Sequence, residues 1–459
     1  MSETVPAHPR DAVDAWHSAL ERSDRGAESA AWLDEQLRER GLFFGERPLC
    51  TVLRPRFLTA GQYALLARRS RLLLRAFGKA FQAAMAQPAI FAQFGLDAWE
   101  AELLRADRGT GPSNPLSRID AFFDQAGGTF KVTELNGETP AGPAYADAIS
   151  EIFLEMPVTG DFLRDWLLWP LPVRHRVLHT LLRAWEAFAG RRSAPVIAIV
   201  DWEEVPTRSE FLLFQEYFRS RGFRCVIVDP AELELRGGRL VAGDHAIDLV
   251  YKRVLLHELV QRRGLDDPLL RAVRDGIVCM VNGFRCKLLH KKASLAVLSD
   301  ERNAALFEEA ERRAIADHVP WTRLVQERRT RYADREVDLV PFVLAERDRL
   351  VLKPNDEYGG AGVVLGWERD ASGWEAAVRR ALESPFIVQE RIEVPKLPFP
   401  SREGGTLRYA DRIADTAPFA FDGELVDGCL TRVSTDSLVN VTAGGGSTMA
   451  TFIVEPRTG

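Results

Sequence analysis

The alternation of apolar and polar positions predicts a β-hairpin early in the chain. Two short apolar runs, residues 117–123 and 130–136, flank a segment that contains two consecutive glycines. Apolar runs of this length around a glycine-containing turn are typical of two antiparallel strands. A hairpin centred on Gly127 sets the register of the two strands, and the register decides which side chains face each other.

Four polar side chains share one face of this hairpin. Arg118 and Asp120 alternate on the first strand, and Glu134 and Asn136 alternate on the second. The register places Asp120 opposite Glu134 and Arg118 opposite Asn136. Facing carboxylates repel each other unless a cation lies between them, and Mg²⁺ prefers oxygen ligands. The pattern indicates a magnesium site, with a solvated polar edge as the alternative, and Arg118 as a ligand for phosphate or carboxylate.

Helical spacing dominates the first hundred residues and recurs later. The pattern predicts mainly helical structure over residues 10–106, including one long helix over residues 56–87. Further helices are expected from Gly142 onward and over residues 166–188. No charge constellation within residues 10–106 indicates chemistry.

Short apolar runs in the middle of the chain predict a small parallel α/β layer. The expected elements are strands at 196–200, 225–229, 247–253 and 278–282 and a helix at 210–221. Asp201 begins the loop after the first strand, at the edge where open α/β sheets bind ligands, and a solvated loop explains it equally well. This region has no GxGxxG sequence, so the dinucleotide-binding fingerprint is absent.

A strand, a group of glycines and a second strand predict a phosphate-binding flap. The unit consists of a strand at 349–353, the glycines Gly359, Gly360 and Gly362, and a return strand at 363–367. Closely spaced glycines let the backbone approach a polyphosphate and offer it N–H donors. Lys353, at the end of the first strand, adds a cation. The chain lacks GxxxxGK[ST], so this is not a Walker loop.

Two further features belong to the same candidate nucleotide site. The apolar strand 386–390 ends in Gln389 and Glu390, which suits an adenine ring and its polar edge; a buried strand that meets solvent is the equal alternative. Lys292, expected within a helix over residues 287–298, is a second cation for the phosphates.

The C-terminal part adds one arginine and a glycine run. Arg432 is a candidate to stabilise phosphoryl charge, and the glycines within residues 440–446 would supply backbone donors or simply form a tight surface turn. His290 is interpreted as structural. The other histidines receive no role, because none pairs at metal-ligand spacing or beside a plausible nucleophile.

Composition narrows the class of protein. With 46% hydrophobic and 27% charged residues, the 459-residue chain resembles a globular protein of two or three lobes. The net charge of −6 argues against a nucleic-acid or membrane-surface partner, because no basic excess neutralises phosphates. No apolar run reaches the ~18–20 residues that span a bilayer. The N-terminus lacks a basic-then-apolar signal, so a cytoplasmic location is expected.

Lysine and cysteine usage sharpen this view. Only eight of the 60 basic residues are lysines. A chain that defaults to arginine keeps lysine where a compact ammonium group is needed, although chance explains any single lysine as well. The five cysteines are scattered and free of CxxC spacing, which is typical of small core residues in a reduced compartment.

These motifs together resemble those of the ATP-grasp superfamily. Glu134-Leu-Asn136 with Thr139-Pro140 looks like its magnesium-binding element, and Arg118-Ile-Asp120 looks like its upstream R-x-D. In an ordinary ATP-grasp enzyme this element comes last, whereas here it precedes both candidate lysines and the glycine flap. The order resembles the circularly permuted branch that includes glutathionylspermidine synthetase and uncharacterised bacterial members. Permutation is physically acceptable because chain termini lie at the surface.

The resemblance implies an ATP- and Mg²⁺-dependent carboxylate–amine ligase. ATP would phosphorylate a carboxylate, an amine would attack the acyl phosphate, and ADP and phosphate would leave. The implied metal ligands are Asp120, Glu134 and Asn136. The implied nucleotide-binding residues are Lys292, Lys353, Gly359, Gly360, Gly362, Gln389 and Glu390. Arg118 and Arg432 are the implied catalytic residues.

Two rival functions keep the nucleotide site. One is a phosphotransferase that stops at a phosphorylated product, and the other is a non-catalytic nucleotide-binding protein. The expected partners are small-molecule carboxylate and amine substrates, without nucleic acid or membrane. The oligomeric state is left open by the sequence.

The expected fold class is α+β or α/β, with a circularly permuted ATP-grasp fold, a helical N-terminal region and a small parallel α/β lobe. The expected divisions are a helical region at 1–108, the magnesium-binding part at 109–190, the α/β substrate-side lobe at 191–285 and the ATP-binding part at 286–459.

Overall fold

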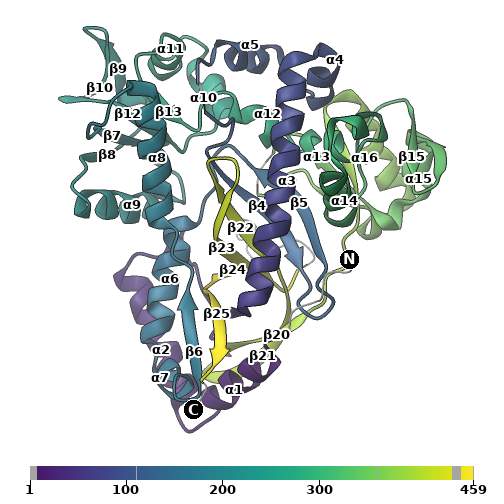
Figure 1. Ribbon diagram of the computed structural model, residues 1–459. Helices are drawn as coiled ribbons and strands as arrows, with labels where there is room; N and C mark the ends of the chain where they lie inside the picture. The colour runs from purple at the N-terminus through teal and green to yellow at the C-terminus, as the bar shows by residue number, and fades with distance from the viewer. Residues whose placement is uncertain (1–7, 110, 358, 437–445, 458–459) are drawn as a thin grey trace.

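A seven-stranded sheet lies at the centre of the molecule, with helices on both faces (Figure 1). The computed structural model describes residues 8–109, 111–357, 359–436 and 446–457. The strands follow the order β20-β21-β23-β22-β4-β5, and β24 pairs with β23. Their bounds are β4 Leu116–Phe123, β5 Phe130–Asn136, β20 Leu397–Glu403, β21 Thr406–Ala414, β22 Ala417–Phe421, β23 Leu425–Ser434 and β24 Gly446–Met449.

The predicted hairpin is confirmed as β4 and β5, with the predicted register. Arg118 pairs with Asn136 and Asp120 with Glu134. Beyond Asp120 the register shifts, and Thr133 is the extra residue of a β-bulge. A bulge leaves its extra residue outside the ladder. The carbonyl of Thr133 is therefore available to a side chain from another element.

Two helices bury this sheet. α3 (Ala60–Ala86) packs Leu73 and Phe77 against the apolar side chains of β4 and β5, and α6 (Pro143–Glu155) contributes to the core on the other face. The long N-terminal helix was expected to start at residue 56. It starts at Ala60 because Thr59 and Gln62 form a capping box. The residues before it form β3 (Arg56–Leu58), which pairs with β25 (Thr451–Pro456).

The predicted parallel layer is confirmed as a four-stranded parallel sheet. Its order is β13-β12-β7-β8, with bounds β7 Ile197–Val200, β8 Cys225–Val228, β12 Leu249–Lys252 and β13 Cys279–Val281. Alternate side chains of these strands join two different cores, one shared with α8 (Arg174–Ala189) and α9 (Arg208–Ser220), the other with α10 (Leu256–Arg263) and α11 (Pro268–Arg274). Helices therefore cover both faces, as parallel sheets require.

An antiparallel sheet carries the glycine flap. Its order is β14-β19-β17-β18, with bounds β14 Thr322–Leu324, β17 Leu350–Pro354, β18 Val364–Leu365 and β19 Phe386–Glu390; α16 (Ala371–Glu383) packs on it. The return strand is shorter than the expected 363–367. The strand gives way at Gly366 to the 3-10 segment η5 (Gly366–Glu368), and a Cβ at this position would collide with the carbonyl oxygen of Arg347, so only glycine permits this packing.

Two expected helices are wrong in part. Residues 166–188 hold β6 (Trp166–Pro170) before α8, because β25 offers an antiparallel partner and prolines at 170 and 172 disfavour a helix. The helix expected over 287–298 is two helices, α12 (Cys286–His290) and α13 (Ala293–Ser299). Asn355 intervenes, since its carbonyl accepts from Lys292 N at 2.9 Å and its Oδ1 accepts from Ala293 N at 2.8 Å.

The N-terminal region is mainly helical, as predicted, and all five cysteines are buried and free. Among the described residues, no helix is long and apolar enough to cross a membrane. The remaining elements are α1 Arg10–Leu20, α2 Arg25–Glu39, β1 Phe43–Phe44, β2 Arg47–Pro48, α4 Pro88–Phe91, η1 Ala92–Phe94, α5 Ala98–Ala106, α7 Pro157–Phe162, η2 Pro230–Glu232, β9 Leu233–Arg236, β10 Arg239–Ala242, β11 His245–Ala246, η3 Glu301–Leu306, α14 Glu309–His318, β15 Arg329–Tyr332, β16 Arg335–Asp338, α15 Leu339–Ala345 and η4 Arg347–Arg349.

Candidate active site

A cavity of about 650 Å³ is bordered by all three of these sheets. It brings together residues from β4, β5, the start of α13, the flap, β19 and β23. Eleven of the twelve predicted site residues line it: Arg118, Asp120, Glu134, Asn136, Lys292, Lys353, Gly359, Gly360, Gln389, Glu390 and Arg432. Residues far apart in the sequence therefore meet at one place.

Asp120 lies between two guanidinium groups. Arg118 donates to both of its oxygens, at 2.5 and 2.8 Å, and Arg432 Nη2 donates to Oδ2 at 2.9 Å. Arg118 also donates to the carbonyl of Ala141. Burial favours the protonated acid, but the two arginines outweigh it and hold the pKa of Asp120 well below its usual range. Asp120 is therefore a carboxylate at neutral pH.

Glu134 faces the cavity beside Lys292. Its Oε2 lies 3.2 Å from Lys292 Nζ. Burial works to raise the pKa of Glu134, and the attraction of Lys292 outweighs it, so the pKa is lowered. Lys292 also donates to the backbone carbonyl of Glu357, at the root of the flap. One lysine thus links the predicted metal-binding strand to the flap.

Among the described residues, Lys353 has only neutral hydrogen-bond partners. Its Nζ donates to Gln389 Oε1 at 2.7 Å and to the carbonyl of the bulge residue Thr133 at 3.2 Å. In the described part of the chain, no carboxylate oxygen lies within 4.0 Å of this ammonium group. Burial lowers the pKa of Lys353 to about 8, against the attraction of Glu134. An anionic ligand in the cavity would supply the missing counter-charge.

The predicted adenine hinge is held by side chains of two neighbouring strands, β14 in the same sheet and β15 in the separate β15–β16 pair. Gln389 donates from Nε2 to Thr322 Oγ1 at 3.0 Å, and Glu390 Oε1 accepts from Tyr332 at 2.7 Å. The two side chains are thus fixed by neighbours while they border the cavity.

The glycines of the flap divide into two kinds. Gly359 and Gly360 have φ values of 61° and 76° and line the cavity. Gly362 also has positive φ, but a Cβ there would lie 2.6 Å from Pro354 Cγ, so this glycine permits packing at the root of the flap. Tyr358 and residues 440–445 of the C-terminal glycine run lie outside the described residues.

Sequence reasoning missed Asp415. This buried residue follows β21, and its carboxylate accepts from Arg432 Nε at 2.6 Å and from the backbone N–H of the same residue at 2.6 Å. It thereby holds the arginine over Asp120. Its sequence signal is weak, because a single aspartate between two strands usually marks a turn.

Sequence reasoning also missed a buried cluster of lysines and acids beside the cavity. Lys287 Nζ lies 3.0 Å from Glu138 and 2.8 Å from Asp356. Lys291 Nζ lies 3.0 Å from Asp356 and 2.7 Å from Glu100. Lys252 Nζ lies 3.2 Å from Glu138. The scarcity of lysine was the available signal. Oxygens of Glu138 and Asp356 lie close enough to His290 for a shared cation, but three ammonium groups already balance the three carboxylates.

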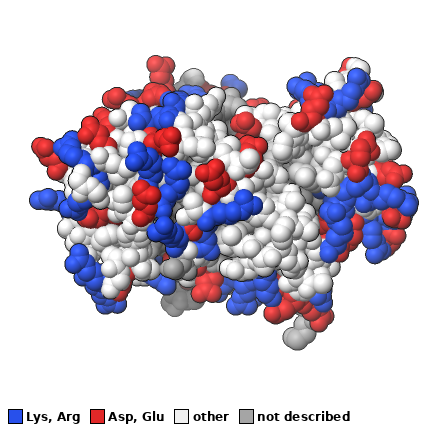
Figure 2. All heavy atoms as spheres, turned by 90° about the horizontal axis from the view of Figure 1, so that it is seen from above, with Lys and Arg blue, Asp and Glu red and all other residues white. Residues whose placement is uncertain are grey.

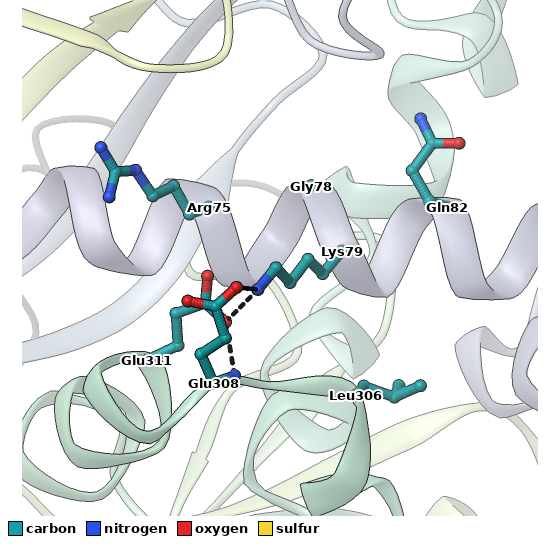
Figure 3. A pocket seen from close by; sticks show the side chains of 7 residues that line it. All are labelled: Arg75, Gly78, Lys79, Gln82, Leu306, Glu308 and Glu311. Atoms are coloured by element: carbon teal, nitrogen blue, oxygen red, sulfur yellow. Dashed lines mark hydrogen bonds and ion pairs between the residues drawn. The ribbon is translucent and has the colours of Figure 1, made fainter.

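A separate hollow of about 520 Å³ lies between α3 and α14 (Figure 3). Lys79 faces two acids there and pairs with Glu308 at 2.7 Å and Glu311 at 2.8 Å. No predicted site residue lines this hollow, among those described, and its main charges satisfy one another. On the face shown in Figure 2, basic and acidic side chains are intermixed.

Comparisons with known proteins show remote relatives. No family model matches the chain. A Frankia casuarinae protein named "Putative glutamate--cysteine ligase 2-2" is 25% identical over 448 residues, 90% of this chain and 48% of that protein. An uncharacterized protein of Mycobacterium tuberculosis is 25% identical over 364 residues, 74% of this chain and 60% of that protein. The chain thus spans about half the length of the first of these relatives.

Among solved structures, a similar chain covers nearly all of this one. A glutathione synthetase-like effector from Globodera pallida superposes with a TM-score of 0.60 at 12% sequence identity, covering 98% of each chain. At this identity the likeness shows the fold alone, and the circular permutation stays a prediction. The chain therefore shares the fold of this glutathione synthetase-like effector.

Proposed function

We propose that this protein is an ATP- and Mg²⁺-dependent carboxylate–amine ligase that releases ADP and forms an amide or peptide bond through an acyl phosphate. The observation that carries the proposal is the cavity itself, where Asp120 and Arg432, 312 residues apart, meet Glu134, Lys292 and Lys353. The ligase name of the Frankia relative supports the same chemistry.

The oxygen donors that line the cavity fit a magnesium ion. Asp120, Glu134 and Asn136 are two carboxylates and an amide on paired strands, with the hard oxygen atoms that Mg²⁺ prefers. When bound, Mg²⁺ would neutralise charge on the nucleotide phosphates. The ion pairs of Asp120 with Arg118 and Arg432 keep its carboxylate ionised and oriented.

The other side chains position the phosphates and exclude water. Lys292 and Lys353 would cancel phosphate charge, because both ammonium groups border the cavity and Lys353 has no acidic partner within 4.0 Å in the described chain. The flap at Gly359 and Gly360 would cover the acyl phosphate, which hydrolyses when exposed to water. Arg432 would stabilise charge on the transferred group.

ATP binding with and without Mg²⁺, measured by thermal shift, tests the site first. A native-state ligand at 100 times its Kd stabilises by about 2.7 kcal/mol. We expect ATP with Mg²⁺ to raise the melting temperature of the wild type, and Glu134→Gln to lose the magnesium-dependent part. Glu375→Gln, on the exposed surface of α16, is the matched control. An unchanged melting temperature for the wild type would contradict the proposal.

Screening acid–amine pairs for ADP release then tests the reaction. ADP release that needs both substrates supports the ligase. A phosphorylated acceptor that accumulates without amine would indicate a phosphotransferase instead, and ATP binding without turnover of any pair would indicate a binding protein.

A further inference from the structure

The cavity extends from the nucleotide-binding residues to the carboxyl edge of the parallel sheet. Its lining there includes Asp201, which follows β7, and Glu258 on α10. The N-terminal region contributes Phe44 to the lining of the cavity. The cavity is therefore larger than the set of residues that the nucleotide site uses, and this second end has its own chemistry.

Asp201 is a buried carboxylate without a cationic partner in the described part of the chain. Asp201 is only 8% exposed to solvent. Its Oδ1 accepts a hydrogen bond from the backbone N–H of Trp202 at 2.9 Å. Across the described residues, no lysine or arginine nitrogen lies within 4.0 Å of this carboxylate, and no hydrogen bond reaches Oδ2. A buried charge of this kind is costly unless something pairs with it.

A second acid lies beside it. Glu258 Oε2 accepts from the indole Nε1 of Trp202 at 3.1 Å, so both carboxylates border the same tryptophan. Burial raises the pKa of Asp201 to about 6, and the negative charge of Glu258 contributes to the rise. Two cations, Arg253 and Lys252, act on Asp201 from a distance and work to lower its pKa. Each has partners of its own: Arg253 donates to Glu210 at 3.3 Å and to the carbonyl of Pro140 at 2.8 Å, and Lys252 lies 3.2 Å from Glu138.

Apolar side chains lie beside these acids in the sequence. Val205 and Leu255 line the cavity, together with the cation Arg253. A buried acid beside apolar side chains suits a ligand that combines a cationic head with a short aliphatic stem, because the stem can pack against these side chains while the head pairs with Asp201.

We propose that this end of the cavity binds the ammonium group of an alkylamine substrate, with Asp201 as its counter-ion and Glu258 beside it. The inference rests on the proposed ligase function and names the class of its acceptor. An ammonium held at this end is not the attacking amine, which must be neutral and reach the acyl phosphate, so the acceptor would carry a second amino group for the attack.

Thermal shift with simple amines tests the subsite without knowledge of the natural substrate. The probes are putrescine, ethanolamine and glycinamide at millimolar concentration, each compared with a hydroxyl or uncharged analogue. We expect at least one amine, but not its analogue, to raise the melting temperature of the wild type by about 1–3 °C. Asp201→Asn should lose this rise, and Glu258→Gln should reduce it. Glu203→Gln, exposed in the same loop, should keep it.

Two results would overturn the inference: no amine-specific rise in the wild type, or an equal rise in Asp201→Asn. The ATP–Mg²⁺ response is measured on the same samples. If that response is present while the amine response is absent, the subsite is wrong and the nucleotide site stands. If the ATP response is absent as well, the proposed function fails with it.

Discussion

Two groups of buried charges lie side by side in this protein, and they differ in how they are paired. In the cluster around Lys287, three ammonium groups face three carboxylates at 2.7–3.2 Å. In the cavity, Lys353 has only neutral partners and Asp201 has no cation within 4.0 Å among the described residues. Burial alone therefore does not identify a ligand site. A buried charge that lacks an opposite charge and borders a cavity is the feature that indicates such a site.

Lys287→Met tests the paired cluster and has the largest expected effect. Removing this ammonium leaves Glu138 and Asp356 with fewer counter-charges in a buried setting. Breaking a buried pair typically costs about 3–5 kcal/mol of unfolding free energy. Urea denaturation measures the loss. A change below about 1 kcal/mol would mean that the cluster is not held together by these ion pairs.

Lys353→Met tests the cavity with the same substitution. Because Lys353 has no acidic partner within 4.0 Å in the described chain, we expect little loss of stability. Substrate-dependent ADP release should fall at least ~10²-fold, as for other preorganised charge contacts. Steady-state kinetics measures the loss of ADP release, and a denaturation curve measures the loss of stability. Lys131→Met on β5 is the control. Full activity would remove Lys353 from the site.

The pH dependence of stability tests the paired cluster, because His290 contacts Glu138 and Asp356 in that cluster. Burial lowers the pKa of His290 to about 4, although Glu138 opposes this. As the pH falls, His290 is protonated in the unfolded state before it is protonated in the folded state. The folded protein therefore keeps its full stability above pH 6.5 and loses free energy of unfolding as the pH falls toward 4. We expect a loss of roughly 2 kcal/mol between pH 6.5 and 5. His290→Asn should flatten this slope, whereas the exposed His245→Asn should not.

Lys79→Gln has the smallest expected effect. Lys79 forms two ion pairs with Glu308 and Glu311 at the surface hollow, where solvent screens the charges (Figure 3). Neither the melting temperature nor ADP release should change measurably. A clear loss of ADP release would show that the hollow between α3 and α14 takes part in function.

Local pattern was enough to predict much of the fold and of the candidate site. The alternation in residues 117–136 predicted the β4–β5 hairpin with its register, and the apolar runs predicted the parallel sheet. Both rest on short-range rules, since side chains alternate along a strand and buried parallel strands are continuously apolar. The glycines of the flap followed from the same kind of rule.

Errors arose where a distant segment decided the outcome. The segment that forms β6 was expected to be helical. It forms a strand because it pairs with β25, which lies near the other end of the chain and which local periodicity does not reveal. The break before α13 depends on Asn355, 62 residues away from the amide it binds. Helical periodicity reports which face of a segment is apolar, and it carries no information about a competing partner elsewhere.

The sequence by itself determined which side chains share a strand face, and so it predicted that Arg118, Asp120, Glu134 and Asn136 converge on one patch. Tertiary structure alone decided that Arg432 completes the pairing of Asp120, that Asp415 holds Arg432, and that Lys353 reaches the bulge carbonyl of Thr133. The physical reason is that pairing of buried charges depends on packing between elements far apart in the chain. Periodicity places a charge on a face, and packing chooses its partner.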